Sequence, residues 1–245
     1  MNKVKLGFFS FVEVTSPEAH RSYNEWHQLD HMPEQYPIPG IAWGQRWVAT
    51  PACASARAAA VAPVAAAHYV ALYLMTEPVA ATLEQFDEVG FRLGALGRFH
   101  RQRQSHLFGG WHLLETTVAP RVLISAEAVP YRPCRGVYTI VEAPNPDEDL
   151  DPWIEQMHTD NVPAMLEVPG VVGAWTFATS AVWRAPHWNT GRTRITVCWL
   201  DEDPCSVAAD LAPVVARRWV DAPVVPLLAG PWETITPWEW SWFDP

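Results

Sequence analysis

The chain is poor in positive charge and has no long apolar run. Its 245 residues include only two lysines, Lys3 and Lys5, and the formal net charge is −10. Nucleic-acid binding needs a basic face, so this balance argues against a nucleic-acid partner. No apolar stretch approaches the roughly 20 residues that span a bilayer. Because Glu13 also interrupts the apolar amino-terminal stretch, we expect a cytoplasmic protein without a membrane partner.

Cysteine is scarce, and the usual cofactor signatures are missing. The four cysteines, at positions 53, 134, 198 and 205, form no Cys-x-x-Cys pair. This spacing argues against a zinc knuckle and against a disulfide framework. No G-x-G-x-x-G, P-loop or G-x-S-x-G motif occurs, so nucleotide cofactors and a hydrolase nucleophile elbow have no support. We therefore expect no cofactor and no metal.

Apolar and aromatic residues are abundant. Hydrophobic residues make up 49% of the chain, which excludes disorder as its main state, and the length allows a sizeable core. The 14 tryptophans are far more than ordinary usage. Indole rings line apolar pockets and interfaces, but they also fill cores, and the composition does not separate the two roles.

The sequence repeats at an offset of 130 residues. Tyr23, Asp30 and Pro33 are matched by Trp153, Asp160 and Pro163, and Pro39-Gly40 is matched by Pro169-Gly170. A second matching pair lies downstream, at Phe108–Trp111 and Leu228–Trp232. A repeat with shared spacing indicates two copies of one structural unit.

Each copy is predicted to contain strands and helices in the order β-α-β-β-α-β. In the first copy we expect strands at 3–14, 41–49, 68–76 and 106–117, and helices from Ser16-Pro17 to about Gln35 and from Pro78 to about Arg103. In the second we expect strands at 136–143, 171–180, 193–201 and 229–236, and helices at 150–167 and 204–219. The alanine-rich stretch at 51–67 is predicted to be a loop with some helical turns.

This order is that of the ferredoxin-like unit, which has helices on one face of its sheet. The other face must be buried, and two fused copies bury it against each other. We therefore predict an α+β fold in which two ferredoxin-like repeats form a pseudo-dimeric α/β barrel around a cavity. The expected domains are the first repeat (1–117), a linker (118–133) and a second, degenerate repeat with a Trp-rich tail (134–245).

A run of residues in the first copy resembles a known family. The pattern consists of Tyr23, Trp26, His27, His31 and Pro33, followed by Pro39, Gly40, Arg46 and Trp47. It is similar to the EthD-like branch of the dimeric α/β-barrel superfamily, and the resemblance is weaker in the second copy. Such a resemblance implies this fold and a small-molecule site. Members include isomerases, dehydratases, decarboxylases, polyketide cyclases and monooxygenases, several of them cofactor-independent, and others bind haem.

The first copy carries ionisable side chains where the second does not. His27, His31 and Arg46 stand opposite Met157, Asn161 and Thr176. We therefore place the candidate active site in the first copy.

His27 and His31 lie four residues apart, on one face of the predicted helix, and three hypotheses remain for them. The pair can perform acid/base catalysis at neutral pH. It can supply two metal ligands, with a third from Glu25, Glu34 or His68. It can also be structural, with one ring in solvent and the other packed.

We predict a cofactor-independent enzyme that performs acid/base chemistry on a hydrophobic, aromatic or polycyclic small molecule. The reaction classes are isomerisation, dehydration, cyclisation and decarboxylation. His31 is the expected general base or acid, His27 assists it, and Arg46 holds an anion. The pocket is expected to be shaped by Tyr23, Trp26, Trp43 and His112. The alternatives are a haem- or metal-dependent monooxygenase and a non-catalytic small-molecule-binding protein.

Two further segments contain clustered aromatic or basic residues. The tail, Pro237–Pro245, holds three tryptophans and a phenylalanine, so it either folds back across the barrel, which we favour, or contacts another subunit of a homo-oligomer. The loop between Trp183 and Trp188 either caps a pocket or simply packs. The basic cluster of Arg98, Arg101 and Arg103 is expected to complement a helix dipole.

Overall fold

The structure contains the two predicted repeats. The computed structural model describes residues 3–145 and 151–244. The elements of the first repeat are β1 (Val4–Val14), η1 (Pro17–Ala19), α1 (His20–Trp26), η2 (His27–His31), β2 (Ile41–Val48), α2 (Pro51–Ser55), β3 (Ala59–Ala60), η3 (Val64–Ala66), β4 (Tyr69–Thr76), α3 (Val79–Ala95) and β5 (Arg103–Val118). After η4 (Ala126–Tyr131), the second repeat comprises β6 (Gly136–Pro144), α4 (Asp151–Gln156), η5 (Met157–Asn161), α5 (Val162–Leu166), β7 (Val171–Ala178), β8 (Arg194–Leu200), α6 (Pro204–Arg217) and β9 (Val224–Thr234).

Eight of these strands close into one antiparallel barrel. The first repeat contributes the order β2-β4-β1-β5 and the second the equivalent order β7-β8-β6-β9. The repeats join at two seams, β5 with β7 and β9 with β2. The second seam is short, since only Trp47 with Thr234 and Val48 with Glu233 are paired. The predicted pseudo-dimeric α/β barrel of ferredoxin-like repeats is therefore confirmed.

The interior of the barrel is packed with side chains, so the predicted central cavity is wrong. Inward-facing residues of all eight strands form one apolar cluster. It includes five fully buried tryptophans: Trp47, Trp111, Trp175, Trp199 and Trp232. An eight-stranded barrel has an interior only just wide enough for its own side chains, and indole rings occupy it here.

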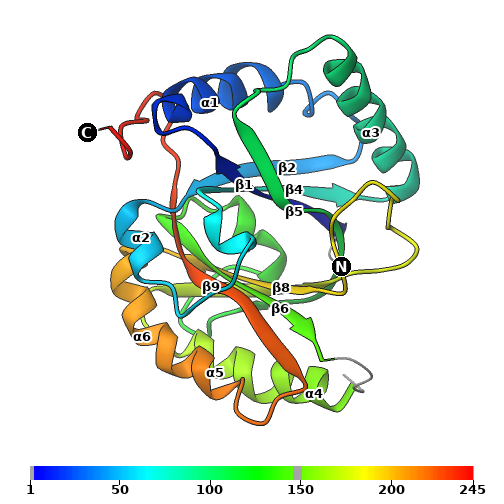
Figure 1. Cartoon of the computed structure of the whole chain (residues 1–245). Coiled ribbons are helices and arrows are strands. Elements are labelled where there is room, and N and C mark those ends of the chain that lie inside the picture. Colours follow the sequence, from blue (N-terminus) through cyan, green and yellow to red (C-terminus); the bar gives the residue numbers. More distant parts are fainter. Residues whose placement is uncertain (1–2, 146–150, 245) are drawn as a thin grey trace.

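The helices of the two repeats cover opposite outer faces of the barrel (Figure 1). Helices α1 and α3 lie over the sheet of the first repeat, with η2 following α1 directly. Helices α4, α5 and α6 lie over the sheet of the second, where they pack into a separate apolar cluster. Any site between a sheet and its helices therefore lies outside the barrel and within one repeat.

Several predicted helix ends are wrong. The helix expected to reach Gln35 ends as a π-turn at His31, where the N–H of Met32 bonds to the carbonyl of His27 and Pro33 has no N–H to continue the ladder. The helix expected to reach Arg103 ends at Ala95, followed by Gly97 at φ 67°, a conformation that suits glycine after a helix. The helix expected at 150–167 is divided into α4, η5 and α5, and residue 150 lies outside the described residues.

The tail folds back onto the first repeat. Trp240 is 5% exposed and belongs to a cluster with Tyr23 and Tyr69. The Phe243 ring stacks on His20, with centroids 3.9 Å apart. The carboxyl end accordingly lies beside α1 (Figure 1). None of the described helices has the length and apolar character needed to cross a membrane.

Candidate functional site

A pocket of about 580 Å³ lies between the outer face of the first-repeat sheet and its helices. Strand alternation decides which side chains reach it. In β1, Phe9 and Phe11 point into the barrel, whereas Phe8 and Ser10 line the pocket. Much of the remaining lining is aromatic and includes Tyr73, Phe86, Phe91, Phe99, Phe108 and Trp188. A volume of this size suits a drug-sized organic molecule.

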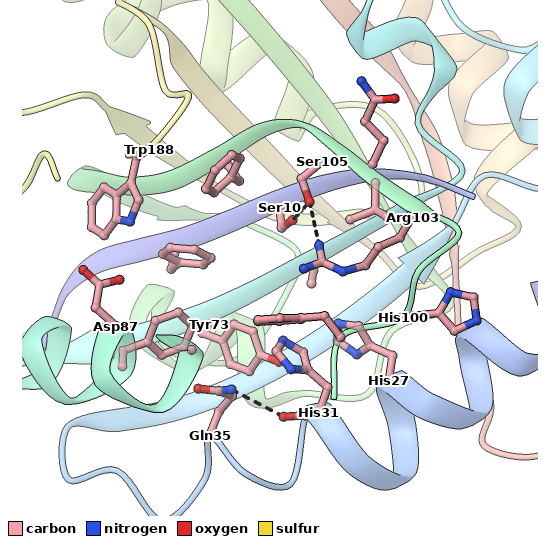
Figure 2. Close-up of a pocket in the computed structure, with 18 of the residues that line it drawn as sticks. Ser10, His27, His31, Gln35, Tyr73, Asp87, His100, Arg103, Ser105 and Trp188 are labelled. Carbon is pink, nitrogen blue, oxygen red and sulfur yellow. Dashed lines mark hydrogen bonds between the residues drawn. The ribbon is translucent and has the colours of Figure 1, made fainter. Parts of the chain in front are cut away.

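His27 and His31 both line this pocket from the π-turn η2 (Figure 2). The turn is closed by the backbone N–H of Met32, which donates to the carbonyl of His27 over 2.9 Å. This widened turn places side chains four apart nearly above one another, and the two imidazole centroids are 5.1 Å apart. The Trp26 ring stacks on His31 at 4.7 Å and fixes its plane.

Both imidazoles are neutral at physiological pH. Burial and, second, the nearby Arg103 guanidinium together lower the pKa of His31 to about 3. Burial also holds the pKa of His27 well below its usual value, with Arg46 as the next cause. The Nδ1 atoms of both rings are buried and lack a hydrogen-bond partner among the described residues. Two neutral, unpartnered imidazoles are therefore available to a ligand.

Arg103 is the pocket's cation. It begins β5 and lies over the rings of Phe99 and Trp26, at 4.6 and 5.6 Å from their centroids. One guanidinium nitrogen donates to Ser105 over 3.1 Å, while its Nε is buried without a partner. Within the described chain no carboxylate pairs with it. The predicted dipole role of Arg103 is therefore wrong, since the residue starts a strand and enters the pocket (Figure 2).

Arg46, the predicted anion holder, does not line the pocket. It is 2% exposed and lies behind Tyr23, with its guanidinium over the Tyr23 and Tyr69 rings. Its Nη2 donates to Asn24 over 2.8 Å. The Asn24 amide in turn donates to the hydroxyl of Tyr69 over 2.9 Å. Arg46 therefore packs behind the pocket wall at Tyr23 and is not among the lining residues, so its role as an anion holder stays a prediction.

The other predicted pocket residues are divided between the pocket and the rest of the barrel. Tyr23 and Trp26 line the pocket. Trp43 instead packs against the barrel core, 6.0 Å from Trp47. His112 lies farther along β5, paired with Leu6 and Ala178, and is not among the lining residues. Strand alternation alone did not show which face of these strands the pocket lies on.

Several lining residues were not predicted from the sequence. Gln35 is 1% exposed, and its Oε1 has no partner, as is true of the Tyr73 hydroxyl. Asp87 of α3 pairs with His187 over 3.4 Å. His187 and Trp188 come from the second-repeat loop before β8, so that loop forms part of the wall. Its paired tryptophans were the available sequence signal.

The residues around the histidine pair do not form a usual three-residue metal site. Glu34 pairs with Arg98 over 2.8 Å, and Glu25 is exposed. His68 accepts the backbone N–H of Val14 over 3.1 Å, away from the pocket. A ligating histidine normally donates its second ring nitrogen to an acceptor, and in the described chain neither Nδ1 has one. A zinc-type site with a third protein ligand at this pair therefore has no support from the geometry.

The equivalent region of the second repeat is more tightly packed, and a smaller pocket of about 340 Å³ lies there beside Trp153, Asn161 and Arg218. Trp153 and Met157 occupy the positions of Tyr23 and His27, and both are buried in the apolar cluster. Arg218 and Glu142 form a buried ion pair there at 2.7 Å. The Trp219 indole also donates to Glu142, over 2.6 Å. The same turn thus supports a packed core in one repeat and a pocket in the other.

Comparison with solved structures identifies the fold but not the activity. The chain is similar to a variant of chlorite dismutase from Candidatus Nitrospira defluvii in complex with cyanide (11% identity, TM-score 0.53, 93% of this chain and 90% of that one). It is also similar to an anthrone oxidase-like protein (11%, 0.50, 96% and 94%). A third neighbour is a protein from Fusobacterium nucleatum provisionally assigned as a monooxygenase (8%, 0.51, 96% and 94%). No family model and no curated protein sequence matches the chain. These neighbours agree with the dimeric α/β-barrel fold found here, whereas the EthD-like branch is not singled out.

Proposed function

We propose that the pocket binds an aromatic small molecule with an acidic hydroxyl or an enolisable carbonyl, and that His31 removes its proton. The observation that carries this proposal is the set of unpartnered polar atoms in an aromatic pocket. The buried Nδ1 atoms of His27 and His31, Oε1 of Gln35, the Tyr73 hydroxyl and Nε of Arg103 all lack a hydrogen-bond partner among the described residues. Buried polar groups are normally satisfied, so such a cluster indicates a ligand-binding function.

The charges are arranged for forming an anion. The neutral imidazole of His31 accepts a proton, and the resulting enolate or phenolate faces both the new imidazolium and the guanidinium of Arg103. Burial disfavours an imidazolium in the empty pocket. The substrate anion offsets that cost, because opposite charges stabilise each other strongly in a dry site. His27 is the second proton acceptor, 5.1 Å from His31 between ring centroids.

The test is hydrogen exchange into an enolisable aromatic ketone. The C1 protons of 2-tetralone in D₂O are followed by NMR, with the wild type, His31→Gln and the off-pocket control His112→Gln. We expect His31→Gln to lower kcat/KM for exchange by about 10²–10⁴-fold. Binding of 2-naphthol should change little, and His112→Gln should behave as the wild type. Equal exchange rates for the wild type and His31→Gln, or no acceleration over buffer, would contradict the proposed proton transfer.

Oxygenation is the second candidate, and the neighbours' names favour it over isomerisation or dehydration. An enolate in an aromatic, water-poor pocket is the electron-rich species that O₂ attacks. For the probe anthrone the balance is one anthrone and one O₂ giving one anthraquinone and one water. The wild type should accelerate O₂ uptake with anthrone, and His31→Gln should not. Uptake without added haem would support the cofactor-independent route, whereas uptake seen only with haem would favour the haem-dependent alternative.

A further inference from the structure

Two cysteines distant in the sequence meet beside the short barrel seam. Cys53 lies in α2 of the first repeat and Cys205 in the first turn of α6 of the second, with their Sγ atoms 3.5 Å apart. Glu233, which is paired with Val48 in the β9–β2 seam, places Oε1 3.7 Å from the Cys53 Sγ. One ligand atom from each of the three residues lies within 4.8 Å of the others. This cluster could not be predicted from the sequence, because Cys53 is 152 residues from Cys205 and 180 residues from Glu233.

The separations between these atoms match those around a tetrahedral zinc ion. With Zn–S bonds of about 2.3 Å and a Zn–O bond of about 2.0 Å, tetrahedral angles give about 3.8 Å between two sulfurs and about 3.5 Å between sulfur and oxygen. The observed distances are 3.5 and 3.7 Å. The two separations that involve Cys53 are thus within a few tenths of an ångström of those of a zinc site, and the third, between Cys205 and Glu233, is at most 4.8 Å.

A second shell already holds the cluster in place. The Thr50 hydroxyl donates to Oε1 of Glu233 over 2.8 Å and accepts the backbone N–H of Cys53 over 3.3 Å. It thereby fixes both the carboxylate and the turn that carries the thiol. Cys53 is fully buried, whereas Cys205 and Glu233 are half-buried, so an ion can enter from their side.

We propose that Cys53, Cys205 and Glu233 bind one Zn²⁺ ion, with water as the fourth ligand. Thiolate and carboxylate ligands suit this borderline-soft cation. The ion would join α2 of the first repeat to α6 and β9 of the second, where the barrel closes through only two paired positions. Its role is to stabilise the seam. The site is independent of the function proposed for the pocket.

The experiment is a Co²⁺ titration of protein treated with chelator and reductant, followed by Zn²⁺ displacement. We expect one Co²⁺ per chain, with the thiolate-to-cobalt absorption in the near ultraviolet that tetrahedral sulfur ligation produces. Cys205→Ser should raise the Kd at least about 100-fold, and Thr50→Val, which removes only the second shell, about 10–100-fold. The matched control Cys134→Ser, another half-buried thiol, should leave the Kd within about threefold.

Cys53→Ser is a second ligand variant, but its burial makes misfolding a risk, so alkylation of wild-type Cys205 provides an independent measurement. Zn²⁺ should protect this half-buried thiol from iodoacetamide, and His31→Gln should show the same protection. Three results would overturn the site: no thiolate–cobalt absorption in the folded wild type, equal Kd values for the wild type and Cys205→Ser, or equal losses in Cys205→Ser and Cys134→Ser.

Discussion

Arg103 is the residue from which we expect selectivity for anionic aromatic ligands. Its guanidinium lies over Phe99 and Trp26, and no carboxylate of the described chain neutralises it. Arg103→Met keeps a long apolar side chain over these rings and removes the charge. The neighbouring Arg101 is exposed and absent from the pocket lining, so Arg101→Met is a matched control.

The size of the effect follows from charge and burial. Two unit charges 4 Å apart attract by about 4 kcal/mol at an effective dielectric constant near 20. Desolvation of both groups reduces this, and hydrogen bonds to charged groups contribute a net ~1.5–3 kcal/mol. We therefore expect Arg103→Met to weaken binding of 2-naphthoate by about 10–150-fold. The neutral 2-naphthamide should lose less than about threefold.

Isothermal titration calorimetry at pH 7.5 and low salt gives both affinities for the wild type and the two variants. The pH dependence is a further check, since burial lowers the pKa of His31 to about 3. In the empty pocket His31 therefore stays neutral, and the wild-type affinity should stay flat between about pH 6.5 and 8, where Arg103 alone carries the charge. Unchanged 2-naphthoate affinity in Arg103→Met would refute this reasoning.

Three further predictions concern stability. Because the folded-state pKa of His31 is about 3 and the unfolded value is 6.5, the unfolded chain binds more protons as pH falls below 6.5. The free energy of unfolding should thus fall by about 2 kcal/mol at pH 5 from this residue, and His31→Gln should remove that share in urea titrations; an unchanged pH slope would count against it. Glu142→Gln leaves the Arg218 charge buried, so it should cost about 3–5 kcal/mol in denaturant unfolding, and a loss below about 1 kcal/mol would contradict the ion pair's role. Trp240→Ala should cost about 3–5 kcal/mol and Trp238→Ala, at 68% exposure, under about 0.5 kcal/mol; equal losses would argue against the docked tail.

The fold could be predicted from the sequence because its signal is periodic. The shared spacing from Tyr23 to Gly40 and from Trp153 to Gly170 predicted two copies of one unit, and burial required them to associate. The same spacing produces a π-turn at the same place in both repeats, His27–His31 and Met157–Asn161. Periodicity did not predict these turns, because a single π-turn differs from an α-helix only in a hydrogen bond that spans five residues in place of four. The spacing of apolar residues does not reveal that change.

The site could be predicted only in part, because strand alternation was hidden. Both faces of β1 and β4 are covered, so almost every residue of these strands is at least partly buried. Their sequences therefore show no regular alternation of buried and exposed positions. The sequence therefore could not show whether Trp43 or Tyr73 faces the pocket. It also could not rank Arg46 against Arg103, since that choice depends on the ring layer formed by Tyr23 and on where α3 ends.

The two repeats place different side chains on the same turn. In the second repeat the shared π-turn carries Met157, which is buried in the apolar cluster, and Arg218 forms an ion pair with Glu142. In the first repeat the same position carries His27, and the turn adds His31 in the pocket that Arg103 also lines. The turn itself therefore does not require imidazoles. Burying polar groups normally costs stability, and binding of the proposed ionisable aromatic ligand would offset that cost.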